Sequence, residues 1–349
     1  MNRGKIIINL SVVILIMMMV CSCAVERDPY LRTLSLDVEY LEASDSINIE
    51  QYDLFQIDEV VSVDEEWLLV SSNKMDYRLL FVNTVTGDHF YTIRKGRGPG
   101  EMLDGGSLHK SGDDAVFYCL KTATCIRLNL DKTVVEREAV YDTIGLFRLG
   151  PSKPVYMTSL SSGCFLSCNL ADPNVWYSLY DRDGNIMSSV AALGFEELSN
   201  DRDDRVSFHA SSKYVAHSSG MKVCVANVCS ASLSFSKLES GVLSEYRRIE
   251  IPPDGMVESR LQQDYISAFH GLAADDDHVY VLYSGNRIWD RKIPVNECRH
   301  LIVYNWDGTP IRHFYLDHTI TSVHVSGDVI YGTSTYPESC VYKFQLLDM

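Results

Sequence analysis

A repeated unit, made of an apolar strand, a polar turn and a more polar strand, constrains the fold more than any other feature of this chain. The clearest copies span residues 177–185 and 301–309, and each contains an Asp-Gly pair, which supplies the positive φ angle that a tight hairpin requires. Further copies span residues 80–88, 126–132 and 233–241. The turns fall near residues 87, 131, 184, 241 and 308, so their spacings run from 44 to 67 residues, whereas a four-stranded propeller blade needs about 40 to 50. The repeat therefore predicts an all-β propeller with loop insertions in the longer intervals.

A second repeated element marks the start of a blade. Residues 107–113 (SLHKSGD) match residues 322–328 (SVHVSGD), and each segment runs directly into an apolar strand. Residues 269–271 precede another apolar strand in the same way. We interpret these segments as the first strands of blades, each turning into the second.

The end of the chain predicts how the ring closes. Five turns and a final apolar strand at residues 341–346 indicate six four-stranded antiparallel blades, but the chain stops after the third strand of blade six. An open strand edge invites aggregation, so the missing outer strand must come from elsewhere. Residues 34–40 alternate suitably, and we predict that this N-terminal strand closes the ring by pairing with the last blade. Trimming residues 30–42 should then remove most of the stability.

The first 23 residues have the pattern of an export signal. Arg3 and Lys5 precede an apolar run of 15 residues, 6–20, which is shorter than the roughly 20 residues of a membrane span. The cysteine at the boundary makes the segment resemble a bacterial lipoprotein signal, in which Cys23 becomes the lipidated first residue. We therefore predict a signal peptide at residues 1–22, a lipidated tether at 23–32 and a propeller domain at 33–349. Several acyl chains on Cys23 would bind the membrane firmly.

Charge excludes two classes of partner. The formal charge of the whole chain is −16, and without the two basic residues of the signal it becomes −18. Such an acidic chain argues against nucleic acid and against electrostatic docking on anionic lipid. Of the ten cysteines, Cys119 and Cys125 flank a predicted hairpin and could face each other. The default for these and the other cysteines after Cys23 is a buried, unpaired thiol.

The stretch Arg94-Lys95-Gly96-Arg97-Gly98-Pro99-Gly100-Glu101 carries a family resemblance. With the lipoprotein-like start and six blades, it resembles the TolB-like six-bladed β-propeller lipoproteins of Bacteroidetes. The resemblance covers nearly all of the mature chain. It implies a propeller fold and a cell-envelope location, with outer-membrane attachment through lipid, and it supplies no agreed catalytic residues.

The same stretch is a candidate binding site. Arg94, Lys95 and Arg97, together with Glu101, surround glycines that could cradle a carboxylate or sulfate. A phosphate-binding glycine loop, however, opens a helix, and no helix is expected here. The alternative is a tight crossover between blades, in which glycines permit close backbone approach.

Four histidines are the second candidate site. His109, His209, His270 and His324 each fall near the end of a predicted first, channel-lining strand. Converging imidazoles could bind a metal or a sugar acid. The alternative is that each one hydrogen-bonds a neighbouring loop. We predict no metal site and no cofactor.

The sequence lacks a catalytic motif, since it contains neither a Gly-x-Ser-x-Gly elbow nor a His-Glu-x-x-His helix. We therefore favour a non-enzymatic, lipid-anchored module that binds a protein or glycan ligand at one face of the ring. The alternative is an enzyme that uses the central funnel, such as a lactonase-like hydrolase or a glycan lyase. Three or more converging Asp, Glu, Asn or His side chains in the channel would favour the enzyme.

Overall fold

The computed structural model describes residues 28–74, 76–147, 156–160, 162–168, 172–192, 210–250, 267–286 and 294–346. The chain divides into two compact units, residues 1–37 and 38–349. The described part of the first unit contains one short helix, α2 (Pro29–Leu34), whose N-terminus is capped by the Asp28 carboxylate. No helix in the described ranges has the length and apolar character needed to cross a membrane. The predicted signal and Cys23 lie outside these ranges.

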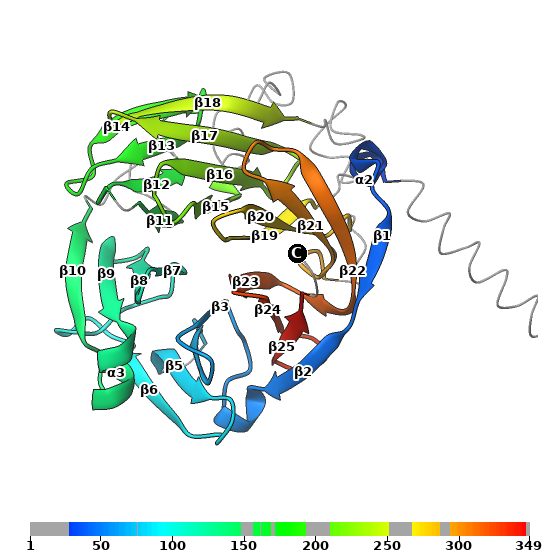
Figure 1. Ribbon diagram of the computed structural model, residues 1–349. Coiled ribbons are helices and arrows are strands. Elements are labelled where there is room, and N and C mark those ends of the chain that lie inside the picture. Colours follow the sequence, from blue (N-terminus) through cyan, green and yellow to red (C-terminus); the bar gives the residue numbers. More distant parts are fainter. Residues whose placement is uncertain are drawn as a thin grey trace, which may run out of the picture. The chain divides into compact units, whose positions relative to one another are not determined.

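The second unit is a ring of six sheets, each with four antiparallel strands as predicted, and one of the sheets has a fifth, parallel strand (Figure 1). Blade one contains β3 (Glu59–Ser62), β4 (Trp67–Ser71), β5 (Tyr77–Asn83) and β6 (His89–Arg94). Blade two contains β7 (Ser107–Ser111), β8 (Asp114–Cys119), β9 (Thr124–Asn129) and β10 (Tyr141–Leu146), with α3 (Leu130–Glu136) before β10. Blade three contains β11 (Met157–Ser159), β12 (Phe165–Cys168), β13 (Val175–Tyr180) and β14 (Ile186–Ala191).

The remaining blades follow in chain order around the ring. Blade four contains β15 (Ser212–Ala216), β16 (Lys222–Asn227), β17 (Leu233–Glu239) and β18 (Val242–Ile249). Blade five contains β19 (Phe269–Ala274), β20 (His278–Tyr283), β21 (Cys298–Asn305) and β22 (Pro310–Ile320), with β1 (Val38–Leu41) as a fifth strand. Blade six contains β23 (Ser322–Ser326), β24 (Val329–Ser334), β25 (Cys340–Gln345) and β2 (Ala43–Asn48), and the short helix η1 (Glu50–Tyr52) follows β2.

The core lies between the blades. Strands in the middle of a blade, such as β5 and β8, are almost wholly buried, because a neighbouring blade covers each side of the sheet. Between blades one and two, for example, Leu69 and Phe81 belong to one apolar cluster with Phe117. This two-sided burial explains why these strands read as continuous apolar runs.

The N-terminal segment closes the ring, which confirms the predicted closure but moves it along the chain. The outer strand of blade six is β2, which pairs antiparallel with β25 and contributes Ile47 to a core with Val341. Of the predicted strand 34–40, only the part from Val38 onward is a strand, and it pairs in parallel with β22 of blade five. The two segments differ in what they bury, because β2 places Ile47, 8% exposed, in the core, whereas β1 is half-buried with Tyr40 80% exposed.

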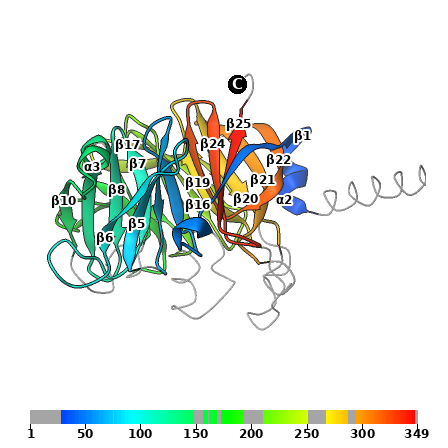
Figure 2. The same cartoon turned by 90° about the horizontal axis from the view of Figure 1, so that it is seen from below.

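The ring has two different faces, which Figure 2 shows edge-on. At the face where the inner strands end, which we name the turn face, the connections are five residues or fewer except at residues 130–140. The turns predicted near residues 87, 184, 241 and 308 all lie there. The one predicted near residue 131 was wrong, because residues 130–136 form α3, capped by Asn129.

The opposite face, where the inner strands begin, is named the loop face. Its described connections between blades include residues 95–106. The longer insertions expected from the repeat spacings fall mostly on residues 193–209 and 251–266, which lie outside the described residues. Among the described residues, the eight cysteines form no disulfide. Cys119 pairs with Thr124 across the hairpin and Cys125 pairs with Tyr118, so the two thiols point to opposite sides of the sheet.

Candidate functional site

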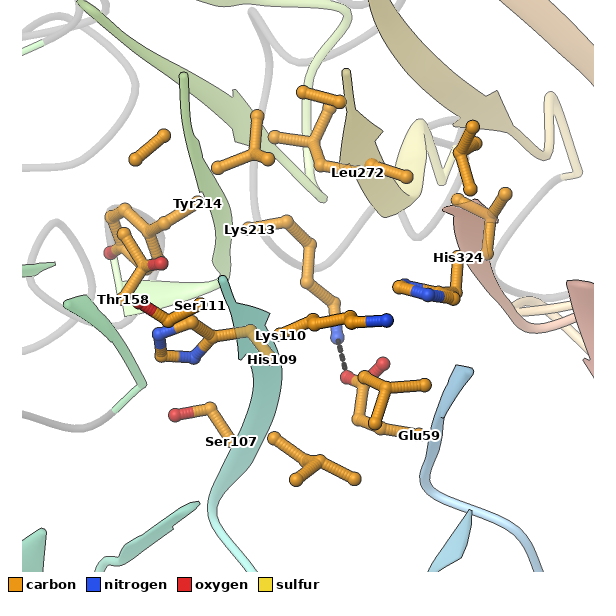
Figure 3. A pocket seen from close by; sticks show the side chains of 18 of the residues that line it. Glu59, Ser107, His109, Lys110, Ser111, Thr158, Lys213, Tyr214, Leu272 and His324 are labelled. Carbon is orange, nitrogen blue, oxygen red and sulfur yellow. Dashed lines mark ion pairs between the residues drawn. The ribbon is translucent and has the colours of Figure 1, made fainter. Parts of the chain in front are cut away.

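A cavity of about 390 Å³ lies among the six inner strands, β3, β7, β11, β15, β19 and β23 (Figure 3). Its volume falls within the range of small-ligand sites. Three of the predicted histidines, His109, His270 and His324, line it, whereas His209 lies outside the described residues. The segments 107–113 and 322–328 do begin blades, because they form β7 and β23 and their turns.

An ion pair crosses the cavity. Lys213 on β15 and Glu59 on β3 come from blades four and one, which lie on opposite sides of the ring, and their charged atoms are 3.5 Å apart (Figure 3). The Lys213 ammonium also lies 5.5 Å from the centre of the Tyr156 ring. Both charged residues stand at the beginning of their strands, so the pair sits toward the loop face.

The pair is only partly dehydrated. The side chains of Lys213 and Glu59 are 29% and 25% exposed. Burial raises the pKa of the Glu59 carboxyl, the neighbouring Asp58 raises it further, and Lys213 opposes the rise. Burial also raises the pKa of the Asp58 carboxyl, whose Oδ2 atom has no hydrogen-bond partner among the described residues.

A second cation enters the cavity nearer the turn face. The Lys110 ammonium donates a 3.0 Å hydrogen bond to the Val63 carbonyl oxygen, just beyond the end of β3. Burial lowers the pKa of Lys110. Two acidic lining residues of this end accept hydrogen bonds from the protein itself: Asp275 accepts the His278 backbone N–H within its own turn, and Asp276 accepts the Ser218 hydroxyl of blade four. The cavity therefore presents two separate ammonium groups in a strongly acidic chain.

Two of the lining histidines tie neighbouring blades together. His109 Nε2 lies 2.9 Å from Ser159 Oγ and accepts the Ser159 backbone N–H at 3.0 Å. His324 Nε2 lies 3.2 Å from Ser62 Oγ in the same arrangement. Each histidine is the third residue of its inner strand, so the repeat seen in the sequence places the same contact at two blade junctions.

The histidines are neutral at physiological pH. Burial lowers the pKa of His109 to about 4, and burial with Lys110 lowers that of His324 to about 3. His270 lies 2.6 Å from Ser267 Oγ within its own blade, and burial with Lys213 lowers its pKa to about 4. The partner serines are buried, which suits structural contacts better than nucleophiles. The geometry thus favours the hydrogen-bonding interpretation of these residues.

The Gly-x-Gly-Pro-Gly-Glu stretch lies away from the cavity, in the crossover from β6 to β7. Glu101 Oε2 accepts the Gly98 N–H at 2.8 Å. A Cβ at Gly96 would stand 1.8 Å from the same oxygen, so only glycine leaves room for the carboxylate. Arg94, Lys95 and Arg97 do not line the cavity. The glycines therefore accommodate the chain's own Glu101, which favours the crossover interpretation.

A buried arginine, missed in the sequence, holds this crossover. Arg78 is 1% exposed and donates to the carbonyl oxygens of Met102 (3.4 Å), Leu103 (3.3 Å) and Ser72 (3.1 Å). Burial lowers the pKa of Arg78. Its position on an otherwise apolar strand was the available signal, since a charged residue in a buried strand requires several partners.

Metal ligands do not converge in the described part of the chain, where no group of three or more His, Cys, Asp or Glu side chains could hold an ion. In the cavity, the Lys213 ammonium accompanies the Glu59 carboxylate. The feature that would favour a metal-dependent hydrolase or lyase is therefore absent from the described residues of the channel.

Six four-stranded sheets around an axial cavity define a six-bladed β-propeller. The family described as TolB-like 6-blade propeller-like matches residues 89–328, and the chain belongs to that family. The resemblance found in the sequence is thereby confirmed.

Solved structures share the fold. The β-propeller domain of Cps50 (Swd1) from Myceliophthora thermophila superimposes with a TM-score of 0.52 at 10% identity, covering 87% of this chain and 99% of that one. The hydrazine synthase of Kuenenia stuttgartiensis gives 0.50 at 12% identity, covering 84% of each chain. At such identities the likeness concerns the fold alone. No curated protein matches this sequence.

Proposed function

We propose that this protein is an exported, lipid-anchored binding module of the cell envelope that holds a small ligand in its axial cavity. The observation that carries the proposal is the cavity itself, which is lined by two ammonium groups, by the Glu59 carboxylate that pairs with one of them, and by two further carboxylates, Asp275 and Asp276, at the turn-face end. Binding alone accounts for this arrangement of charged side chains. A ring of packed blades supplies a rigid frame, and rigid frames suit recognition.

A plugging variant tests the cavity. Leu272→Trp would obstruct it, because Leu272 lines the cavity and a bulkier ring there narrows the space (Figure 3). The matched control is Val85→Trp, at a residue that is 73% exposed on the turn face. Calorimetry with galactose and galacturonate as probes should show binding to the wild type and the control but not to the plugged variant. Equal binding by all three proteins would refute a cavity site, and conversion of a probe would favour the enzyme alternative.

A second experiment tests the anchor. The export signal and lipidation rest on Arg3, Lys5, the apolar run and Cys23 in the sequence. The wild-type chain should fractionate with outer membranes, and Cys23→Ala should release it, because several acyl chains are needed for stable attachment. Mass spectrometry of the N-terminal peptide should show acyl chains on Cys23. An unmodified, soluble wild-type protein would refute the anchor while leaving the cavity proposal intact.

A further inference from the structure

We propose that the carboxylate of an acidic ligand, such as a uronic acid sugar, replaces Glu59 as the partner of Lys213. The Glu59–Lys213 ion pair then closes the loop-face end of the cavity until such a ligand exchanges into it. This inference rests on the proposed function, since it names the ligand class and the switch of the same cavity.

The ion pair is poorly suited to a purely structural role. Its charged atoms are 3.5 Å apart, whereas charge-assisted hydrogen bonds are usually 2.7 to 2.9 Å long. By contrast, Arg312 binds Glu39 through two bonds of 2.6 and 2.9 Å at the junction of β22 and β1. Burial works against the charge of Glu59, so moving its carboxylate toward solvent relieves a penalty.

The two partners differ in how firmly they are held. Lys213 is the second residue of β15, where it pairs with Ala226 of β16, and its ammonium lies near the Tyr156 ring. The backbone of Glu59 is also held, because it pairs with Ser71 of β4 and its N–H donates to Ser71 Oγ. The difference lies in the side chains, since among the described residues Lys213 is the cation that pairs with the Glu59 carboxylate, and no ring lies beside that carboxylate as Tyr156 lies beside Lys213. We therefore expect Lys213 to stay in place and Glu59 to swing away when a competing carboxylate arrives.

Lys110 gives the ligand a second contact. Its ammonium has three N–H donors, and the hydrogen bond found among the described residues uses one of them, to the Val63 carbonyl. A sugar acid held by Lys213 through its carboxylate would meet Lys110 deeper in the cavity with its hydroxyl groups. The volume of about 390 Å³ has room for such a ligand.

Calorimetry at pH 7 on the exported protein tests the exchange. Glu59→Gln removes the competing carboxylate, so galacturonate should bind roughly tenfold more tightly, equivalent to about 1.4 kcal/mol, with galactose unchanged. Lys213→Met should abolish galacturonate binding, and Lys213→Arg should retain part of it. The matched control is Glu39→Gln, which breaks the ion pair with Arg312 in blade five and should change neither affinity.

Each outcome decides the inference. An unchanged or weaker affinity of Glu59→Gln for galacturonate would overturn it, as would an equal gain for inorganic sulfate, which would indicate a general anion site. Failure of both sugars to bind any variant also overturns it, together with the proposed function. If Leu272→Trp abolishes binding but Glu59→Gln affects both sugars alike, the cavity site stands and the exchange fails.

A second readout does not depend on affinity. In protein with ¹³C-methylated lysines, the NMR signal of Lys213, assigned from its loss in Lys213→Met, reports on its ion partner. Glu59→Gln should shift this signal, and galacturonate should shift the wild-type signal by exchange of one carboxylate for another. A Lys213 chemical shift that stays unchanged at saturating galacturonate would contradict the exchange.

Discussion

The turn face and the loop face of the ring differ in the length of their connections and in how far apart in the chain their contacting residues lie. At the turn face, neighbouring strands of one blade are joined by connections of five residues or fewer in all but one case, and side chains of adjacent residues complete each turn. Asp181, for example, accepts the backbone N–H groups of Asp183 and Asn185. At the loop face, connections such as residues 95–106 join different blades, and contacts such as the Glu59–Lys213 ion pair link residues far apart in the chain.

This difference distinguishes the part of the ring that stabilises the fold from the part that we propose binds ligand. The Glu59–Lys213 pair lies toward the loop face and joins opposite blades. The turn face contributes local order, in glycines such as Gly308 with φ of +82°. A change at the turn face should therefore alter stability and leave binding intact, whereas a change of the cavity residues near the loop face should do the reverse.

The largest expected effect is on the stability of the whole ring when the strand that closes it is removed. Replacing residues 43–48 with a Gly-Ser linker of equal length leaves β25 as an open edge, and we expect the free energy of unfolding to fall by more than about 5 kcal/mol. The same replacement of residues 38–41 removes the half-buried fifth strand but leaves the four strands of blade five paired, so it should cost less. Denaturant unfolding measures both, and equal losses would contradict the assignment of closure to β2.

Arg78→Met tests whether every residue of the loop face serves binding. The substitution leaves three carbonyl oxygens without their buried donor, so we expect a loss of about 3 kcal/mol in unfolding free energy. Galacturonate affinity of the folded variant should stay unchanged, because Arg78 does not line the cavity. A weakened affinity at full stability would show that the crossover shapes the site.

Gly308→Ala applies the same test to the turn face. An added Cβ would stand 2.6 Å from Arg247 Cγ in a backbone conformation that side chains disfavour, so we expect a loss of roughly 2 kcal/mol. Gly327→Ala is the control, because it also has positive φ but meets no atom within 4 Å. Thermal unfolding compares them, and equal destabilisation would show that backbone strain alone decides the effect.

The smallest effect concerns the histidine hydrogen bonds that link neighbouring blades. The folded-state pKa of His324, about 3, lies below the unfolded value of about 6.5, so the unfolded chain binds more protons between these limits. Its contribution is complete above pH 6.5 and is lost as the pH falls, by about 1.4 kcal/mol per unit. His324→Gln should show a correspondingly shallower decline of the unfolding free energy from pH 6.5 to 5, measured by denaturant unfolding, and a slope equal to that of the wild type would contradict this role.

Local patterns made much of the fold predictable. The turn near residue 308 and the histidine positions on β7 and β23 follow from short repeats. The strand that closes the ring could not be chosen from local patterns, because residues 34–40 and 43–48 are both plausible strands. Only the burial of Ile47 against Val341 selects the second. The Glu59–Lys213 pair could not be predicted, since it depends on the number of blades and on the register of two strands that no local pattern relates.

The closure by β2 also affects the order in which the parts of the propeller fold. Ser44 Oγ donates to the Lys343 carbonyl oxygen, although the two residues are 299 positions apart. Contacts between such distant residues form slowly, because a long loop must close before they can stabilise the chain. A segment made at the beginning of synthesis must therefore wait for the last blade. We therefore expect β2, which is synthesised before the blades, to pair last during folding.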